Sequence, residues 1–247
     1  MTAAEAFFAS RSMQALEVLA FGPSTATQLA AELQVHPRTA RRLLNRMVHD
    51  GWLIRRDGAR PTYTPTMRIV ALAAQLAHRA PLVRHATDVA RDLYERVGTP
   101  VHVAIPSYRS ALRLVRVAGG CDGTPALRDL APAHAIAAGK LLLAFREPWR
   151  DVVLDFPLAS TTDKTLVDAG RLRAELDVTR DRGYALEDEE FRAGARALAV
   201  PVRAGGEVVA ALAVSSHDAS LAELVASNER AMLAAEELSA RLAVEPA

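Results

Sequence analysis

The chain has 247 residues, of which half are hydrophobic and 24% are charged, a composition typical of an ordinary globular protein and not of a disordered or fibrous one. Its length predicts two domains. The single cysteine, Cys121, excludes an intramolecular disulfide and a cysteine-based zinc cluster. The first residues lack the features of a secretory signal and no apolar run reaches membrane-spanning length, so we expect a cytoplasmic protein that makes no membrane contact.

The formal net charge of +1 conceals a local excess of positive charge. Between Val35 and Tyr63, seven arginines stand against only two aspartates, and the rest of the chain is therefore net negative. A polyanionic partner should meet the N-terminal part of the protein.

Three helices are predicted in this N-terminal part. The first covers Met13–Phe21, where apolar residues recur at helical spacing. A short second helix begins after Thr25, which forms a capping-box pattern with Gln28. The third helix begins with His36 at the cap position and Pro37 at the first helical position, where the missing N–H costs nothing.

The third helix has one apolar and one cationic face. Its apolar residues recur at helical spacing, and they are Ala40, Leu43, Leu44, Met47 and Val48. A basic hairpin follows, with arms at 52–56 and 62–64 and a tip at 57–61. This order of elements predicts a winged helix-turn-helix that binds DNA.

The side chains expected to contact DNA come from the third helix and the hairpin. They are Arg38, Thr39, Arg41, Arg42, Asn45, Arg46, Arg56, Arg60 and Thr62. In a major groove, arginine can donate two hydrogen bonds to guanine O6 and N7, and Asn45 can pair with an adenine or a phosphate. The hairpin residues would bind phosphates or the minor groove. Two alternatives stay open: the arginines only solvate a helix face, or they meet an acidic protein partner.

The rest of the chain predicts an α+β domain. A helix over Met67–Ala80 is interrupted before Pro81, because a residue that precedes proline disfavours the helical region. We therefore expect a DNA-binding domain at 1–66, a linker helix at 67–80 and a second domain at 81–247. After a further helix over 83–97, the expected elements are strands at 101–105, 112–117, 184–187, 197–203 and 208–215, and helices at His134–Phe145, Leu166–Arg182 and Leu221–Leu242. This order suggests helices packed on a mostly antiparallel sheet.

Several segments resemble one known family. Residues 12–53 resemble the DNA-binding module of the IclR (isocitrate lyase regulator) family, in Leu29-Ala30, Pro37, Leu43-Leu44 and Gly51-Trp52. Residues 133–144 resemble its His-Ala-x-x-x-Gly-Lys segment, and residues 180–202 resemble its Arg-Gly-Tyr, Glu-Glu, Gly and Ala-x-Pro-Val signature. Residues 210–215 resemble the last strand of its pocket, although the family often has serine where Ala213 stands.

The resemblance implies a GAF-like effector-binding domain in a homodimer or dimer of dimers on a pseudo-palindromic operator, without a cofactor. It places Ala137, Ala138, Glu187, Ala197, Ala213 and Ser215 in the effector pocket. Small residues at Ala135, Ala137, Ala138 and Gly139 would let a ligand approach the backbone N–H groups of a helix start, a natural seat for a carboxylate. We therefore expect an organic or aromatic acid as effector.

Other motifs have competing interpretations. Gly139 and the neighbouring alanines could instead serve only close packing, and we expect Lys140 to be a surface charge. The acids at 187–190 are expected to form a solvated loop or an ion-pair network and not a metal site. An enzymatic alternative would use Ser216 or Cys121, but no partner base or catalytic motif accompanies either residue, so we expect no enzyme. Whether the protein represses or activates a catabolic operon stays open.

Overall fold

The computed structural model describes residues 3–20, 22, 24–77, 79–119, 121–122 and 130–244. The chain divides into two compact units, Met1–Arg79 and Ala80–Ala247. None of the described helices combines the length and the apolar character that crossing a bilayer requires.

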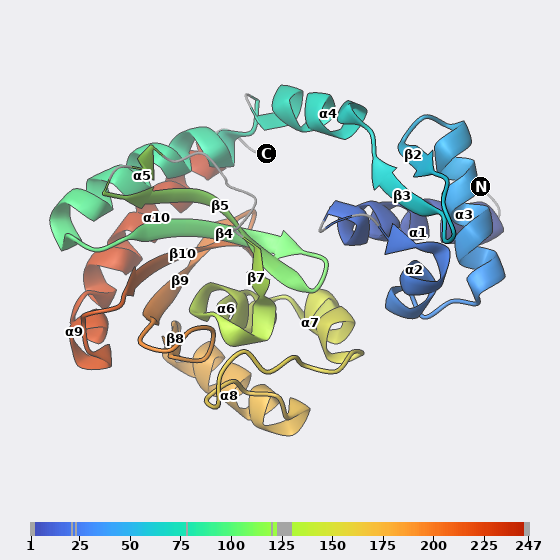
Figure 1. Cartoon of the computed structure of the whole chain (residues 1–247). Helices are drawn as coiled ribbons and strands as arrows, with labels where there is room; N and C mark the ends of the chain where they lie inside the picture. The colour runs from blue at the N-terminus through green and yellow to red at the C-terminus, as the bar shows by residue number, and fades with distance from the viewer. Residues whose placement is uncertain are drawn as a thin grey trace. The chain divides into compact units, whose positions relative to one another are not determined.

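The N-terminal unit combines helices with a small antiparallel sheet. Its elements are α1 (Ala3–Ala20), β1 (Ser24–Thr25), α2 (Ala26–Glu32), α3 (Pro37–His49), β2 (Leu53–Arg56), β3 (Thr62–Pro65) and α4 (Met67–Ala77). The strands pair in the order β1-β3-β2, so β3 lies between the other two (Figure 1). The core of this unit is formed by buried residues of α1, α2, α3 and the two hairpin strands.

The predicted helix starts are confirmed in α2 and α3. Thr25 accepts a hydrogen bond from the backbone N–H of Gln28, and the Gln28 side chain accepts one from the backbone N–H of Thr25, which completes the capping box. His36 Nδ1 accepts a hydrogen bond of 3.2 Å from the backbone N–H of Arg38, and Pro37 stands in the first turn. Helix α1 begins at Ala3, earlier than predicted. The added segment is rich in alanine, which favours the helix without an apolar periodicity.

The first turn of α4 is attached to the base of the hairpin. The guanidinium of Arg68 lies 4.2 Å from the centre of the Trp52 ring and donates a hydrogen bond to the backbone oxygen of Asp50. The hydroxyl of Thr66 donates to the backbone oxygen of Gly51. These contacts attach the start of α4 to the turn that ends α3.

The C-terminal unit is a seven-stranded antiparallel sheet with helices on both faces, which confirms the predicted α+β class. Its strands are β4 (Val101–Ser107), β5 (Ser110–Ala118), β6 (Cys121–Asp122), β7 (Leu130–Pro132), β8 (Ala185–Asp188), β9 (Arg196–Ala204) and β10 (Glu207–Ser216). Their order is β6-β5-β4-β10-β9-β8, with β7 also paired to β5. The helices are α5 (Pro81–Val97), η1 (Ala133–Ala135), α6 (Ala137–Phe145), α7 (Glu147–Leu154), α8 (Ala169–Arg182), α9 (Leu221–Ala226) and α10 (Asn228–Val244).

The two faces of this sheet carry different side chains, because successive residues of a strand point to opposite sides. Helices α5 and α10 cover one face of the sheet and α6 covers the other (Figure 1). The strand residues that face α5 and α10 are mostly valine and leucine, whereas alanine predominates on the face toward α6. The small side chains let α6 and η1 pack very closely. A Cβ added at Gly139 would lie only 2.1 Å from the backbone oxygen of Ala133, so only glycine fits there.

Some element bounds differ from those predicted. The helix expected from His134 begins at Ala137, because Ile136 is extended, with φ of −122° and ψ of 148°. The predicted closing helix is divided into α9 and α10 at Ser227, whose hydroxyl donates to the backbone oxygen of Leu224. Helix α8 begins three residues later than predicted, because Asp168 caps it by accepting a hydrogen bond from the backbone N–H of Arg171.

Candidate functional site

A groove in the N-terminal unit lies beside α2, α3 and the β2–β3 hairpin; we call it the N-terminal groove. It has a volume of about 880 Å³, and its polar lining comprises Thr27, Gln28, Arg41, Asn45, Arg55 and Arg60, among others. Arg41 and Asn45 belong to α3, and Arg60 to the hairpin tip, so the two elements predicted to contact DNA share one concave surface. Three of these residues, Thr27, Gln28 and Arg55, are not among the DNA contacts predicted from the sequence.

The cationic face of α3 is exposed. Ala40, Leu43, Leu44 and Met47 are buried, and the opposite side of the helix presents Arg38, Arg41, Arg42, Asn45 and Arg46 to solvent. Thr39 is half-buried. In the hairpin, Arg56 and Arg60 are exposed, while Thr62 is half-buried and pairs with Arg56 across the strands.

Among the described residues, Arg46 and Arg55 are each paired with a neighbouring carboxylate. Arg46 Nε lies 3.0 Å from Asp50, and Arg55 lies 2.9 Å from Asp57. Within the described ranges, no ion pair joins Arg41, Arg56 or Arg60 to a carboxylate. The surface therefore keeps a strong excess of positive charge.

One hydrogen bond joins α3 to the hairpin. The hydroxyl of Tyr63, a buried residue of β3, lies 3.3 Å from Oδ1 of Asn45 and donates to it. Because Oδ1 accepts this bond, Nδ2 is the donor group that Asn45 can offer to a ligand in the groove.

A second concave site lies in the C-terminal unit, on the alanine face of the sheet; we call it the C-terminal cavity. It has a volume of about 570 Å³ and is lined by residues of β4, β5, β8, β9 and β10 and of the loop between β8 and β9. Its lining contains four arginines against two acids, Glu187 and Asp218, and one of the four, Arg196, is paired with acids outside the cavity. The cavity is therefore electropositive.

Of the eight residues predicted for the effector pocket, three line the C-terminal cavity and five do not. Glu187, Ala197 and Ser215 line the C-terminal cavity. Ala213 is buried between its cross-strand neighbours His102 and Ala199. The remaining four are buried and do not line the cavity, and they are Ala135, Ala137, Ala138 and Gly139. The contact of Gly139 with Ala133 gives it a packing role, and Ile136 is the residue of that segment that reaches the cavity.

Glu187 occupies the position expected for a ligand carboxylate. Its Oε2 accepts a hydrogen bond of 3.4 Å from the backbone N–H of Ala137, at the start of α6. Burial raises the pKa of Glu187 to about 7, although the N–H of Ala137 opposes the shift. The backbone N–H of Ala137, at the start of α6, therefore already has a hydrogen-bond acceptor within the protein.

His102 is the most deeply buried charged or polar group of β4. Only 6% of it is exposed. Burial, together with the charges of Arg113 and Arg116, lowers the pKa of His102 to about 3, so its ring is neutral near pH 7. Sequence reasoning missed His102 and both arginines, which belong to no motif.

Lys140 is buried, and the expectation of a surface charge is wrong. Only 1% of the residue is exposed, and its Nζ lies 2.5 Å from Oε1 of Glu190 and 4.0 Å from Glu175. A signal for this was present, because the residues around Lys140 in α6 are apolar on every side, which is typical of a fully buried helix.

Asp188, at the end of β8, and Glu189, directly after it, form the ion-pair network expected as an alternative to a metal site. Lys164 and Arg196 each bind both Asp188 and Glu189, at 2.7 to 3.1 Å. No group of three or more potential metal ligands was found among the residues that the structure describes.

The enzymatic alternative named Ser216 and Cys121, and neither is placed in a catalytic arrangement by the part of the chain that the structure describes. The Ser216 hydroxyl accepts hydrogen bonds from the backbone N–H groups of Asp218 and Ala219, so it holds a turn. Cys121 is placed in β6, opposite Ala118, but its side chain is outside the described part.

Comparisons with known proteins agree on one family. The model of the bacterial transcriptional regulator IclR C-terminal domain matches residues 74–240. The transcriptional regulator KdgR of Dickeya chrysanthemi is 27% identical over 198 residues, which cover 76% of this chain and 63% of that protein, just under two thirds of its length.

Solved structures show the same fold. One from Silicibacter sp. TM1040, assigned to the IclR transcriptional regulators, superimposes with a TM-score of 0.72 at 24% identity and covers 96% of each chain. An IclR homologue from Microbacterium hydrocarbonoxydans, solved in complex with 4-hydroxybenzoate, has a TM-score of 0.60 at 25% identity and covers 92% of this chain and 99% of that one. The family model covers more than half of the chain, and the chain therefore belongs to the IclR family of bacterial transcriptional regulators.

Proposed function

We propose that the chain binds a DNA operator through a winged helix-turn-helix in its N-terminal unit and that an organic or aromatic acid in the C-terminal cavity alters this binding. The observation that carries the proposal is the N-terminal groove, where the arginines of α3 and of the hairpin face one concave surface. Whether the outcome is repression or activation depends on where the operator lies relative to the promoter.

The DNA contacts divide between the two elements. Helix α3 enters the major groove, where Arg38, Arg41 and Arg42 donate to guanine, and Nδ2 of Asn45 donates to a phosphate or a base acceptor. Arg56, Arg60 and Thr62 bind phosphates beside it, which adds affinity but little sequence discrimination. Arg46 contributes less, because it is paired with Asp50.

The effector site is the C-terminal cavity, with Glu187, Ala197 and Ser215 in its wall. Its electropositive lining favours an anion. The Microbacterium relative was solved with 4-hydroxybenzoate, an aromatic acid, which supports the same ligand class here. The domains are assigned as 1–66 for DNA binding, 67–80 for the linker and 81–247 for a GAF-like effector domain.

The effector acts by shifting the population of dimer geometries, and so the spacing of two recognition helices on a pseudo-palindromic operator. The assembly is a homodimer or a dimer of dimers. Helix α4 is the transmission element, since Arg68 and Thr66 attach its start to the turn after α3.

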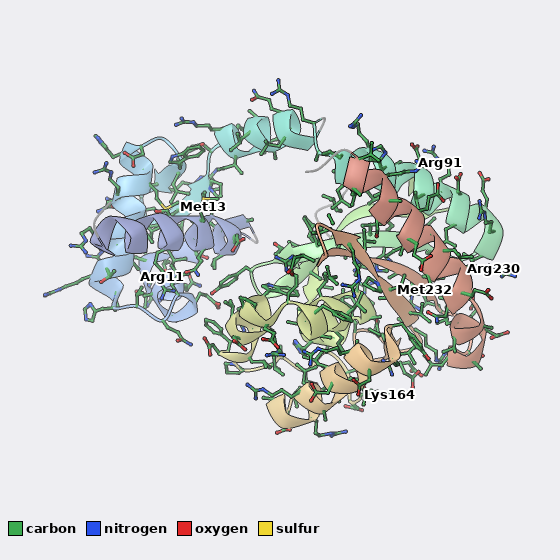
Figure 2. The ribbon with its side chains drawn as sticks, turned by 180° about the vertical axis from the view of Figure 1, so that it is seen from behind. Arg11, Met13, Arg91, Lys164, Arg230 and Met232 are labelled. Atoms are coloured by element: carbon green, nitrogen blue, oxygen red, sulfur yellow. The ribbon has the colours of Figure 1, made fainter. Side chains whose placement is uncertain are left out.

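Selection of duplexes from randomly sheared genomic DNA of the source bacterium tests the proposal. We expect the wild-type protein to enrich a pseudo-palindromic sequence, and the variant carrying Arg41→Ala and Arg42→Ala to enrich none while it unfolds like the wild type. The control is Arg230→Ala, an exposed arginine on α10 (Figure 2). If the wild type enriches no sequence, or the double variant enriches the same one, the proposal is wrong. In the first case an acidic protein partner becomes the better candidate for α3.

A further inference from the structure

Two arginines of β5 line the C-terminal cavity although their spacing predicts otherwise. Arg113 and Arg116 are three residues apart, and in a regular strand they would point to opposite faces of the sheet. The register between β4 and β5 shifts at this place: Arg116 pairs with His102, Val115 with Val103, and Arg113 with Ala104.

Leu114 is the extra residue of this β-bulge, opposite no partner on β4. A bulge of this kind turns the following side chain to the other face of the sheet. Arg113 and Arg116 consequently share the face of His102 and Ala104, and both line the cavity. The bulge therefore concentrates two guanidinium groups on the wall of one cavity.

His102 completes a polar corner of the cavity beside this pair. It is more than nine-tenths buried, it lines the cavity, and no hydrogen bond of its ring is found among the described residues. A buried polar side chain without such a bond is costly unless a ligand or water supplies one. The neutral ring has one donor and one acceptor nitrogen, which suits a hydroxyl or a carbonyl group.

Part of the remaining wall of the cavity is apolar and can contact the body of a ligand. Ile136, Phe191 and Ala197 are apolar and line the same cavity. The Phe191 ring lies 6.0 Å from the guanidinium of Arg113, so an apolar surface borders the cationic one. At the start of α6, the N–H of Ala137 already donates to Glu187, whereas Arg113 and Arg116 offer two guanidinium groups on the cavity wall.

We propose that Arg113 and Arg116 bind the carboxylate of the effector and that the ring of His102 hydrogen-bonds a hydroxyl or oxo group of the same molecule. The effector class is thus a hydroxy or oxo acid with an apolar body that packs on Phe191 and Ile136. Arginine suits this task, because its planar fork matches the two oxygens of a carboxylate. The inference rests on the proposed function, since it assigns the chemistry of the effector site.

Isothermal titration calorimetry on the full chain tests the arginine pair. The probes are 4-hydroxybenzoate, benzoate, 4-hydroxyphenylacetate, pyruvate and 2-oxoglutarate, each beside its carboxamide. We expect at least one acid to bind, and its amide to bind at least about tenfold more weakly. Arg113→Gln or Arg116→Gln should each weaken the binding of that acid by about tenfold or more. Lysine at either position should restore part of the affinity because it restores the charge. Arg230→Gln is the matched control.

The assignment is overturned if no acid binds, if amides bind as well as acids, or if both glutamine variants bind the acid like the wild type. His102→Leu removes both ring nitrogens and tests the second contact: it should abolish the preference for 4-hydroxybenzoate over benzoate, or for an oxo acid over its deoxy counterpart, and keep the preference for acid over amide. These outcomes are separable from the proposed DNA binding, because duplex selection with the wild type needs no acid.

Discussion

The hydroxyl of Tyr63 donates a hydrogen bond of 3.3 Å to Oδ1 of Asn45 and so joins the hairpin to the exposed face of the third helix. Tyr63→Phe removes this bond and keeps the ring in the core. We expect a loss of stability of about 0.5–1.5 kcal/mol, and a several-fold weaker operator affinity because Asn45 and the hairpin lose their fixed relation. Fluorescence anisotropy with the selected duplex measures the affinity. Tyr94→Phe, in the other unit, is the control, and unchanged affinity in Tyr63→Phe would show that the bond has no role in positioning.

Gly139→Ala distinguishes close packing from ligand access at the start of α6. The new methyl would lie 2.1 Å from the oxygen of Ala133, and since that atom belongs to the backbone, the segment must shift. We expect a loss of about 1–3 kcal/mol in denaturant unfolding of the C-terminal unit. In Gly119→Ala the new methyl group would lie 3.6 Å from the Tyr94 hydroxyl, an ordinary contact, so the loss of stability should be much smaller. Equal stability of the two variants would argue against the packing role.

The buried ion pair of Lys140 and Glu190 links α6 to the loop that borders the C-terminal cavity. Lys140→Met leaves the carboxylate of Glu190 buried without its main partner, and should cost about 3–5 kcal/mol. Replacing both residues, by Lys140→Met with Glu190→Leu, should recover most of this loss. Urea unfolding of the three proteins measures the effect, and a double variant no more stable than the single one would contradict this account.

The pKa of Glu187 predicts a pH dependence of stability. Burial raises this pKa from 4.5 to about 7, so the folded state holds the proton more tightly than the unfolded state. The contribution to stability is complete below pH 4.5 and is lost as the pH rises through 7, by an amount on the order of 3 kcal/mol. His102 acts in the opposite direction: its lowered pKa contributes stability above pH 6.5 that is lost as the pH falls toward 3.

The difference between wild type and Glu187→Gln isolates the carboxyl group from His102. We expect the variant to gain stability relative to the wild type as the pH rises from 4.5 to above 7, in urea unfolding at a series of pH values. A difference that does not change with pH would contradict the raised pKa.

The helix starts of the N-terminal unit could be predicted because their signals are local. Thr25 with Gln28, and His36 with Pro37, are recognisable within four residues of sequence. Helix α7 had a local signal that sequence reasoning missed, since Pro148 stands in its first turn.

The cavity residues depend on contacts between distant segments, and for this reason the sequence could not identify them. The bulge at Leu114 is set by pairing with β4, so the strand spacing places Arg113 and Arg116 on opposite faces when the sequence is considered alone. The close approach of α6 to Ala133 likewise appears only when the chain folds back, although it explains why glycine stands at 139.

The salt dependence of operator affinity tests the central claim, namely that the cationic face of α3 and the hairpin lie along a duplex. The slope of log affinity against log salt reports the number of phosphates that the protein neutralises. We expect Arg60→Gln to weaken binding and reduce the slope by about one, and Arg46→Gln to change it less because Asp50 already pairs with that guanidinium. A wild-type affinity that does not change between low and high salt would contradict the account.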